Sequence, residues 1–292
     1  GGGAVAVTGN TKGRGRLDAV VAGGGVVGAA CALALARAGL EVALVEPRPA
    51  PRWLAERPDL RVYSLAPDNA GLLDRLGVWP QVLAARAQPY RRMRVWDAAG
   101  GGELAFDAAA MARAELGWIV ENDLLVDRLW AALATAGVQL QCPAKVESME
   151  QDAAGVRLRL DDGSRLDARV AVAADGAASD PRPLGGLGGG ARDYHQRGVV
   201  AFIDTQKPHE DTAWQRFLPS GPLALLPFTQ GRSSIVWTLP EAEAARVLAL
   251  DDAAFAGELA DASAARLGGV VPASARVAFP LRRQLVRQQV AG

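Results

Sequence analysis

The sequence of 292 residues predicts an α/β fold that opens with a βαβ unit and continues into an antiparallel β-sheet. Two short apolar runs flank an alanine-rich stretch of helical character in "AVVAGGGVVGAACALALARAGLEVALVEP", residues 19–47. Apolar and polar residues then alternate across two turns between residues 144 and 174. Four further β-prone runs, bounded by Gly, Pro and Ser, lie between residues 199 and 239.

The first of these features places three glycines between a strand over 18–22 and a helix that begins near Val26. Gly23 permits a tight turn, Gly25 lets the backbone approach a pyrophosphate, and Gly28 lets the helix pack closely on the strand. The helix N-terminus then faces the phosphates. Gly39 is expected to end the helix before a second strand over 41–45.

An acid completes the pattern, because Glu46 lies eighteen residues after Gly28, where a carboxylate accepts hydrogen bonds from an adenosine ribose. The alternative is an ordinary tight βα turn followed by a solvated Glu46. A secretory signal is a second alternative, since basic residues precede the uncharged run 19–36. Asp18 and the glycines count against that alternative, because they interrupt its basic and helical regions.

Composition narrows the classes of function. The 32 basic residues balance 32 acidic ones, which gives no electrostatic argument for a nucleic-acid partner. Cys31 and Cys142 are too few for a disulfide framework or a metal site, so we expect a cytoplasmic protein without a metal. His195 and His209 show no ligand spacing, and both are expected at the surface.

The remaining elements follow in order. Residues 1–16 are expected to be a flexible leader, and the glycine cluster over 183–193 a loop or hinge. An amphipathic helix is expected to align Leu65, Leu72, Leu73 and Leu76 on one face. A hairpin over 93–106 and a helix over 121–137, capped near Asn122 or Asp123, come next.

The alternating segment predicts an antiparallel meander that runs into a buried strand over 170–174. The later β-prone runs predict an antiparallel sheet beside the nucleotide fold. Its aromatic residues have two possible roles, because an apolar sheet face can bind an aromatic ring or simply pack the core. These residues are Trp214, Phe217, Phe228 and Trp237.

The segment "AADGAASDPR", residues 173–182, adds a strand end followed by Asp175 and Gly176. Together with the glycine-rich turn, it resembles the FAD-dependent aromatic hydroxylases, the single-component flavoprotein monooxygenases. The sequence is most similar to their ubiquinone-biosynthesis branch, the polyprenylphenol hydroxylases. That similarity rests on "DLRVYSLAP", "VENDLLVDRLW", "WQRFLPSGPLALLPF" and "SSIVWTLPEAEA", and it spans residues 17–292.

The resemblance implies a glutathione-reductase-like FAD-binding domain over 17–190, with a hairpin near 90–107 that contributes to the substrate side. It implies a substrate-binding β-sheet domain over 191–280, and a return to the FAD domain that starts at 281–292. The FAD pyrophosphate would lie at Gly23, Gly25 and Gly28, and the adenosine ribose at Glu46. Arg61 and Asn122 would lie near the flavin or its phosphates, although Arg61 can be a solvated charge and Asn122 a helix cap. Asp175 and Gly176 would serve FAD and the approach of the nicotinamide donor.

The implied activity is hydroxylation of a polyprenylated phenol with O2, FAD, and NADH or NADPH as the electron donor. No catalytic residue is identified. The implied enzyme is cytoplasmic and contacts the membrane periphery or a quinone-biosynthesis complex, and it can be a homo-oligomer. Alternatives are a hydroxylase of another aromatic compound, a soluble NAD-dependent reductase, and a noncatalytic flavin- or prenylphenol-binding subunit.

The family pattern also includes a third flavin motif, a Gly-Asp pair followed by a proline and a glycine-rich turn. The sequence stops at Gly292, where the strand before that motif is expected to begin. We therefore expect the encoding gene to continue past this residue.

Overall fold

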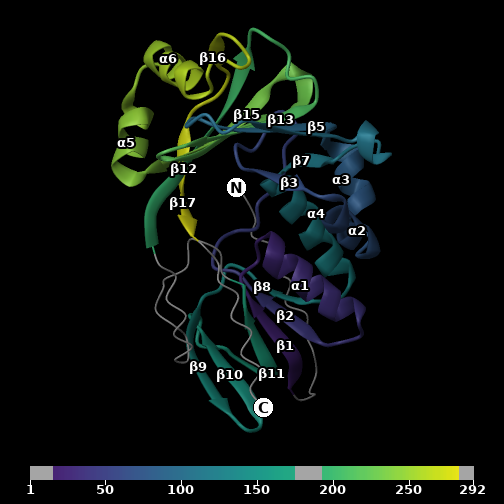
Figure 1. Cartoon of the computed structure of the whole chain (residues 1–292). Helices are drawn as coiled ribbons and strands as arrows, with labels where there is room; N and C mark the ends of the chain where they lie inside the picture. The colour runs from purple at the N-terminus through teal and green to yellow at the C-terminus, as the bar shows by residue number, and fades with distance from the viewer. Residues whose placement is uncertain (1–15, 175–192, 283–292) are drawn as a thin grey trace. The chain divides into compact units, whose positions relative to one another are not determined.

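The structure, a computed structural model, describes residues 16–174 and 193–282 (Figure 1). These residues form two compact units. The first holds residues 16–53, 72–81 and 123–174, and the second holds residues 54–71, 82–122 and 193–282.

The first unit is built on a six-stranded sheet with the order β8-β2-β1-β11-β10-β9. The strands β8, β2, β1 and β11 are parallel, whereas β11, β10 and β9 form an antiparallel meander. Their bounds are β1 Leu17–Ala22, β2 Val42–Val45, β8 Gln139–Gln141, β9 Val146–Asp152, β10 Gly155–Leu160 and β11 Arg165–Ala173. The predicted βαβ unit and meander are therefore confirmed.

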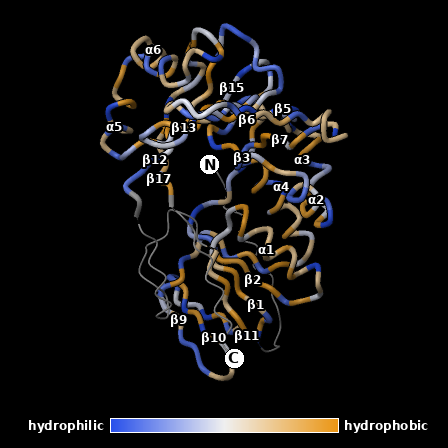
Figure 2. Tube along the Cα trace, viewed as in Figure 1, coloured by the Kyte–Doolittle hydropathy of each residue, from blue (hydrophilic) through white to orange (hydrophobic). Residues whose placement is uncertain are grey.

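The core of the first unit follows from the apolar runs of the sequence. Val20, Val21 and Leu44 are completely buried in β1 and β2, as parallel central strands require. Figure 2 shows this pair of strands as a hydrophobic layer. Helix α1 (Val26–Arg37) packs on both strands, and it ends just before Gly39, whose φ of +88° fits the predicted stop.

The second unit contains a large sheet with the order β16-β12-β15-β14-β13-β5-β6, to which β17 adds by pairing with β12. Its strands are β5 Arg92–Asp97, β6 Glu103–Asp107, β12 Asp193–Thr205, β13 Thr212–Leu218, β14 Gly221–Pro227, β15 Ser233–Pro240, β16 Val270–Pro272 and β17 Val277–Arg282. The predicted antiparallel pairing of β12, β15, β14 and β13 is confirmed, as is the β5–β6 hairpin. In contrast, β5 and β13 run parallel.

Helices α5 (Glu241–Ala249) and α6 (Asp252–Ala262) lie on one face of this large sheet (Figure 1). Phe255 from α6 and Trp237 from β15 meet in the core between them, with ring centroids 6.4 Å apart. Trp237 therefore packs the core, as one of its two predicted roles requires. The other face carries a smaller cluster in which the Phe202 and Phe228 rings stack at 4.7 Å.

A three-stranded sheet of order β3-β7-β4 contributes Ile119 and Tyr90 to that smaller cluster. Its strands are β3 Val62–Leu65, β4 Gln88–Tyr90 and β7 Gly117–Glu121. Short 3-10 turns occur at η1 (Ala109–Met111) and η3 (Thr229–Gly231). Three helices are divided between the units. Helix α2 (Pro67–Arg75) begins in the second unit and ends in the first, whereas α3 (Trp79–Ala85) begins in the first and ends in the second. Helix α4 (Asn122–Thr135) has its first residue in the second unit and the rest in the first.

Two details of the predicted secondary structure are wrong. The proposed leucine face does not exist, because Leu65 ends strand β3 and Leu72 is 43% exposed, while Leu73 and Leu76 are buried. The expected strand over 170–174 forms as the end of β11, but it is not a buried strand. Val170 is 51% exposed. Sequence hydrophobicity alone does not reveal which apolar residues face a neighbour.

Candidate functional site

The glycine turn after β1 has the geometry that its spacing predicts. Gly23 adopts a φ of +112°, which only glycine tolerates readily, and its N–H donates to the carbonyl oxygen of Val45 at 2.8 Å. A Cβ on Gly28 would lie 1.8 Å from the carbonyl oxygen of Gly23. Helix α1 can therefore approach the strand only if residue 28 has no side chain.

Gly25, in contrast, faces open space. A Cβ at this position would meet no heavy atom within 4 Å, and its φ of −72° is accessible to any residue. Gly25 is the N-cap of α1, and no side chain caps this helix or places an acid in its first turn. The N–H groups of the first turn and the positive end of the helix dipole thus remain suited to an anion. This glycine cradle, residues 23–28, fits a pyrophosphate.

Glu46 lies beside the cradle, directly after β2. Its Oε2 accepts a hydrogen bond from the backbone N–H of Gly24 at 2.9 Å. The side chain is partly exposed, and among the described residues no hydrogen bond engages its Oε1. One carboxylate oxygen thus positions the turn, while the other is suited to accept from a ribose hydroxyl.

Sequence reasoning missed Trp130, which comes from helix α4. Its indole Nε1–H donates to the carbonyl oxygen of Gly24 at 2.8 Å. The ring leaves no room for a side chain there, since a Cβ on Gly24 would lie 2.5 Å from the Cζ2 atom of Trp130. The two residues are 106 positions apart, so no local spacing in the sequence could have indicated this contact.

The second unit brings Arg61 and Asn122 together, although they are far apart in the sequence. The backbone N–H of Asn122 donates to the carbonyl oxygen of Arg61 at 2.9 Å, next to the pairing of β3 with β7. The Arg61 guanidinium is exposed and lies 4.7 Å from the centroid of the Phe279 ring. Asn122 is the first residue of α4. The structure thus pairs these two predicted residues at one corner of the second unit.

A buried ion pair supports the same corner. Glu121, which is 0% exposed, accepts from Arg86 through both oxygens at 2.8 and 3.1 Å. It also accepts from the N–H of Asp59 at 2.9 Å, and Asp59 in turn accepts from the N–H of Arg61. A carboxylate removed from water needs such partners. Glu121 and Arg86 therefore hold the backbone at Asp59 in place, a contact that the sequence did not indicate.

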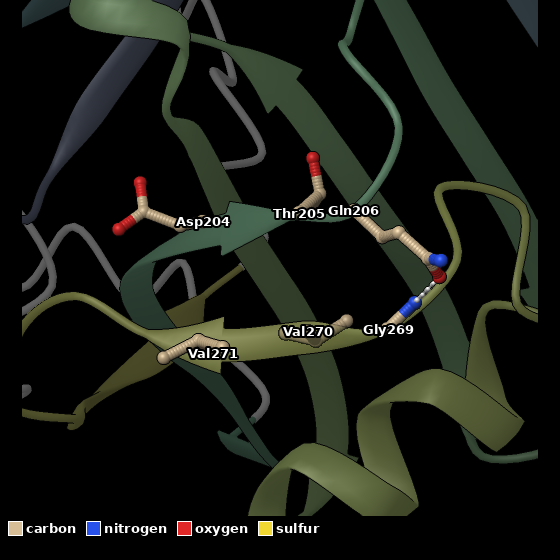
Figure 3. Close-up of a pocket in the computed structure, with 6 residues that line it drawn as sticks. All are labelled: Asp204, Thr205, Gln206, Gly269, Val270 and Val271. Carbon is tan, nitrogen blue, oxygen red and sulfur yellow. Dashed lines mark hydrogen bonds between the residues drawn. The ribbon is translucent and has the colours of Figure 1, made fainter.

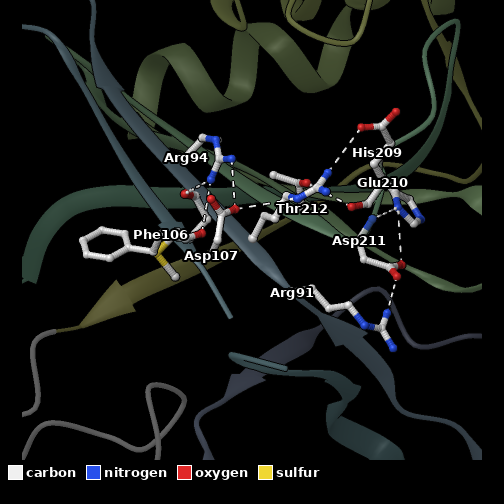
Figure 4. A network of polar contacts seen from close by, with 10 residues as sticks. Arg91, Arg94, Phe106, Asp107, His209, Glu210, Asp211 and Thr212 are labelled. Atoms are coloured by element: carbon white, nitrogen blue, oxygen red, sulfur yellow. Dashed lines mark hydrogen bonds and ion pairs between the residues drawn. The ribbon is translucent and has the colours of Figure 1, made fainter. Parts of the chain in front are cut away.

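The expectation for His209 is wrong, whereas His195 is exposed as predicted. His209 is only 9% exposed, and its Nε2 lies 3.0 Å from the carbonyl oxygen of Phe228. The N–H of Asp211 donates to Nδ1 at 3.0 Å, so Nε2 carries the proton and donates to the carbonyl. Asp211 also pairs with Arg91 (Figure 4). His209 therefore holds the β12–β13 connection in place.

Other groups add no further centre of chemistry among the described residues. Burial raises the pKa of the Cys31 and Cys142 thiols, both of which are free, so neither is an activated thiolate. No group of three or more His, Cys, Asp and Glu side chains in residues 16–174 and 193–282 could hold a metal ion. No helix in the described part of the chain is long and apolar enough to cross a membrane. Asp175 and Gly176 lie outside the described residues.

A hollow of about 320 Å³ lies at the edge of the large sheet (Figure 3). Strands β12 and β16 form it, and the N–H of Gly269 donates to Oε1 of Gln206 across it at 3.1 Å. Its carboxylate, Asp204, lies 3.6 Å from the Arg232 guanidinium. None of the predicted site residues lines this hollow, and its one carboxylate is paired with Arg232. Its lining residues are Asp204, Thr205, Gln206, Gly269, Val270 and Val271.

Comparison with known proteins places the cradle in context. A family model described as "FAD binding domain" matches residues 16–287. The chain is 35% identical over 275 residues to 3-demethoxyubiquinol 3-hydroxylase of Escherichia coli (strain K12), covering 94% of this chain and 70% of that protein. It is 34% identical to ubiquinone hydroxylase UbiL of Rhodospirillum rubrum, covering 94% of this chain and 63% of that protein.

A human relative, the mitochondrial ubiquinone biosynthesis monooxygenase COQ6, is 34% identical over 256 residues. That match covers 82% of this chain and 54% of the human protein, so the chain spans about half to 70% of the relatives' lengths. Among solved structures, PqsL of Pseudomonas aeruginosa, a probable FAD-dependent monooxygenase, aligns with a TM-score of 0.71 at 21% identity, covering 92% of this chain and 74% of that chain. The monooxygenase PieE, solved with FAD and substrate, aligns with a TM-score of 0.65 at 19% identity, covering 91% and 50%. These likenesses show the predicted α/β fold.

Proposed function

This chain belongs to the FAD-binding-domain family, and from that premise we propose that it acts as an FAD-dependent monooxygenase on a polyprenylated phenol in ubiquinone biosynthesis. The observation that carries the proposal is the glycine cradle, which is open at Gly25 and closed at Gly28. The substrate class comes from the relatives, two of which are named for hydroxylation in ubiquinone metabolism. Another aromatic compound is the alternative substrate.

The binding roles proposed for this chain rest on the geometry of each unit. Gly23, Gly25 and Gly28 would hold the pyrophosphate, and Glu46 the adenosine ribose. Bound FAD would supply the redox chemistry with NADH or NADPH and O2. The protein's own groups would bind and orient the reactants and exclude water.

Arg61 and Asn122 are proposed to contact the flavin or its phosphates. Their support is the backbone bond that joins them, together with the polar anchoring of Arg61 through Asp59. Asp175 and Gly176 keep the role that the sequence predicts for them. We propose that the substrate ring binds to the large sheet of the second unit, on the face opposite α5 and α6. This face carries partly exposed apolar residues such as Phe217, which is 45% exposed.

We also propose a cytoplasmic location with peripheral membrane contact, because a polyprenylated phenol resides in a membrane. The exposed side chains of Leu104, Phe106 and Met111, which follow one another along β6 and η1, support such a contact. Figure 4 shows Phe106 pointing away from the neighbouring polar network. Association with a quinone-biosynthesis complex, or as a homo-oligomer, remains part of the proposal.

The test is FAD binding followed by turnover. The protein expressed from its complete gene is titrated with FAD, flavin absorbance and fluorescence are recorded, and NADH and NADPH oxidation is measured with and without a short-chain prenylphenol. We expect bound flavin, donor oxidation stimulated by the phenol, and a hydroxylated product, whereas the 292-residue chain alone is expected to bind FAD weakly and to form no product. A colourless protein that oxidises the donor indicates the reductase alternative, and prenylphenol binding without turnover indicates the noncatalytic one.

Gly25→Val is the matched variant. Because a Cβ at this position meets no heavy atom within 4 Å, the variant should fold with only the small loss of stability of a poorer N-cap, while its FAD affinity falls by at least about tenfold, or about 1.4 kcal/mol. Undiminished FAD affinity in a folded Gly25→Val protein would refute the placement of the pyrophosphate.

A further inference from the structure

The peptide groups on both sides of Gly24 are held by side chains from different elements. Glu46, after β2, accepts from the Gly24 N–H at 2.9 Å, and Trp130, from α4, donates to the Gly24 carbonyl at 2.8 Å. Gly24 itself is buried. Each of these two peptide groups has one polar group held by a side chain, the N–H in the first and the carbonyl in the second, and this restricts the rotation of both.

The direction of these bonds has a consequence for the next residue. In a trans peptide, the carbonyl group and the following N–H point in opposite directions. Because the Gly24 carbonyl points toward Trp130, the N–H of Gly25 points away from it. Likewise, the bond to Glu46 turns the Gly23 carbonyl toward α1, where a Cβ on Gly28 would meet it.

The alternative orientation of this peptide would be harmful to an anion site. If the peptide between Gly24 and Gly25 rotated by half a turn, its carbonyl oxygen would replace the Gly25 N–H beside the bound phosphates. A carbonyl oxygen carries partial negative charge, so it would repel them. A device that prevents this rotation increases anion affinity by preorganisation, without touching the ligand.

We propose that Trp130 is a positioning residue for the cofactor: its indole N–H locks the Gly24 carbonyl and thereby aims the Gly25 N–H at the pyrophosphate. The inference rests on the proposed function, since it concerns the same cradle. It explains why the middle position of the turn is also glycine, because a Cβ there would meet the Trp130 ring at 2.5 Å. It also gives helix α4 a part in cofactor binding.

The test separates the hydrogen bond from the packing of the ring. Replacing Trp130 with β-(3-benzothienyl)alanine keeps the ring shape but substitutes sulfur for the N–H group. We expect this variant to bind FAD about three- to tenfold more weakly, the effect of one hydrogen bond. Trp130→Phe should show a similar or larger loss. In the protein without FAD, amide exchange of residues 23–28 should accelerate by a similar factor.

Trp237→Phe is the control, because Trp237 packs in the core of the second unit beside Phe255. It should lower the melting temperature and leave FAD affinity unchanged. If the benzothienyl variant binds FAD as tightly as the wild type and its exchange is unchanged, the positioning role is overturned. If the wild type binds no FAD, the proposed function fails instead. In that case the amide exchange of residues 23–28 still tests the hydrogen bond by itself, because an unchanged exchange rate in the benzothienyl variant would show that Trp130 does not restrain the Gly24 carbonyl.

Discussion

Glu46 and Glu121 occupy comparable places in the two units, yet their surroundings differ. Each lies at the end of a strand and accepts from a backbone N–H of a distant loop, at Gly24 and Asp59 respectively. Glu121 is fully buried and both of its oxygens are engaged by Arg86. Glu46 is partly exposed, and the described residues include no basic partner for it. A carboxylate with all its partners inside the protein stabilises structure, whereas one with an oxygen to spare can bind a ligand.

The largest effect is expected from breaking the buried pair. Arg86→Met leaves the Glu121 carboxylate buried without its cation, which should cost about 3–5 kcal/mol of unfolding free energy. Urea denaturation measures this loss. The double variant Arg86→Met/Glu121→Leu should recover much of it, because no charge is then buried. A single-variant cost below about 1 kcal/mol would mean that the pair behaves like a surface salt bridge.

A smaller loss of stability is expected at Gly28. Gly28→Ala forces α1 away from the Gly23 carbonyl and should cost about 1–3 kcal/mol, the usual penalty of overpacking. Gly25→Ala, three residues earlier, should cost less, about 1 kcal/mol at most, because its Cβ meets no heavy atom within 4 Å and only the N-cap preference of α1 is affected. Thermal melting of the two variants compares them directly. Equal melting temperatures would contradict the geometry of the cradle.

If Glu46 binds the ribose, its replacement should lower the affinity for FAD and should lower stability less than Gly28→Ala does. Glu46→Ala removes the acceptor for the Gly24 N–H and the proposed acceptor for the ribose, so FAD affinity should fall about tenfold or more. Glu46→Gln keeps one carbonyl oxygen and should bind FAD with intermediate affinity. Isothermal titration gives the three values. If the Glu46→Ala variant binds FAD as tightly as the wild type, Glu46 has only a structural role, as Glu121 does.

The smallest loss of stability is expected at an exposed ion-pair network on α5 and α6. Comparing it with the buried Arg86–Glu121 pair tests how much burial increases the contribution of an ion pair to stability. Arg246 donates to Glu243 and Glu258, and these hydrogen bonds raise the pKa of Arg246 and lower that of Glu258. The lowered pKa of Glu258 contributes stability above its unfolded pKa of about 4.3. That contribution is lost as the pH falls through the lower folded value.

Arg246→Met should therefore be slightly less stable than the wild type at pH 7, and the difference should shrink on acidification to pH 3. Urea midpoints at the two pH values measure it. A loss at pH 7 as large as that of Arg86→Met would show that burial does not distinguish the two ion pairs.

Local spacing in the sequence was sufficient for the βαβ unit, the glycine turn, the meander and the hairpins. These features depend on contacts between near neighbours or on a period of apolar residues, both of which are written in consecutive positions. Gly23 and Gly28 could be assigned their roles for this reason, and the positive φ of Gly23 and the close approach at Gly28 confirm the backbone part of those roles. The contacts of these glycines with FAD stay predictions.

Only the tertiary structure decided the partners that lie far apart in the chain. Trp130 reaches Gly24 across 106 positions, and Glu121 reaches Asp59 across 62. His209 is buried with its ring hydrogen-bonded to the Phe228 carbonyl, although its neighbours in the sequence are polar. A side chain's partner depends on which elements pack together, and that is settled by the burial of the whole apolar surface rather than by any short segment. The sequence by itself therefore determined where the backbone turns tightly after β1, and the packing of helix α4 decided which side chain bonds the Gly24 carbonyl in that turn.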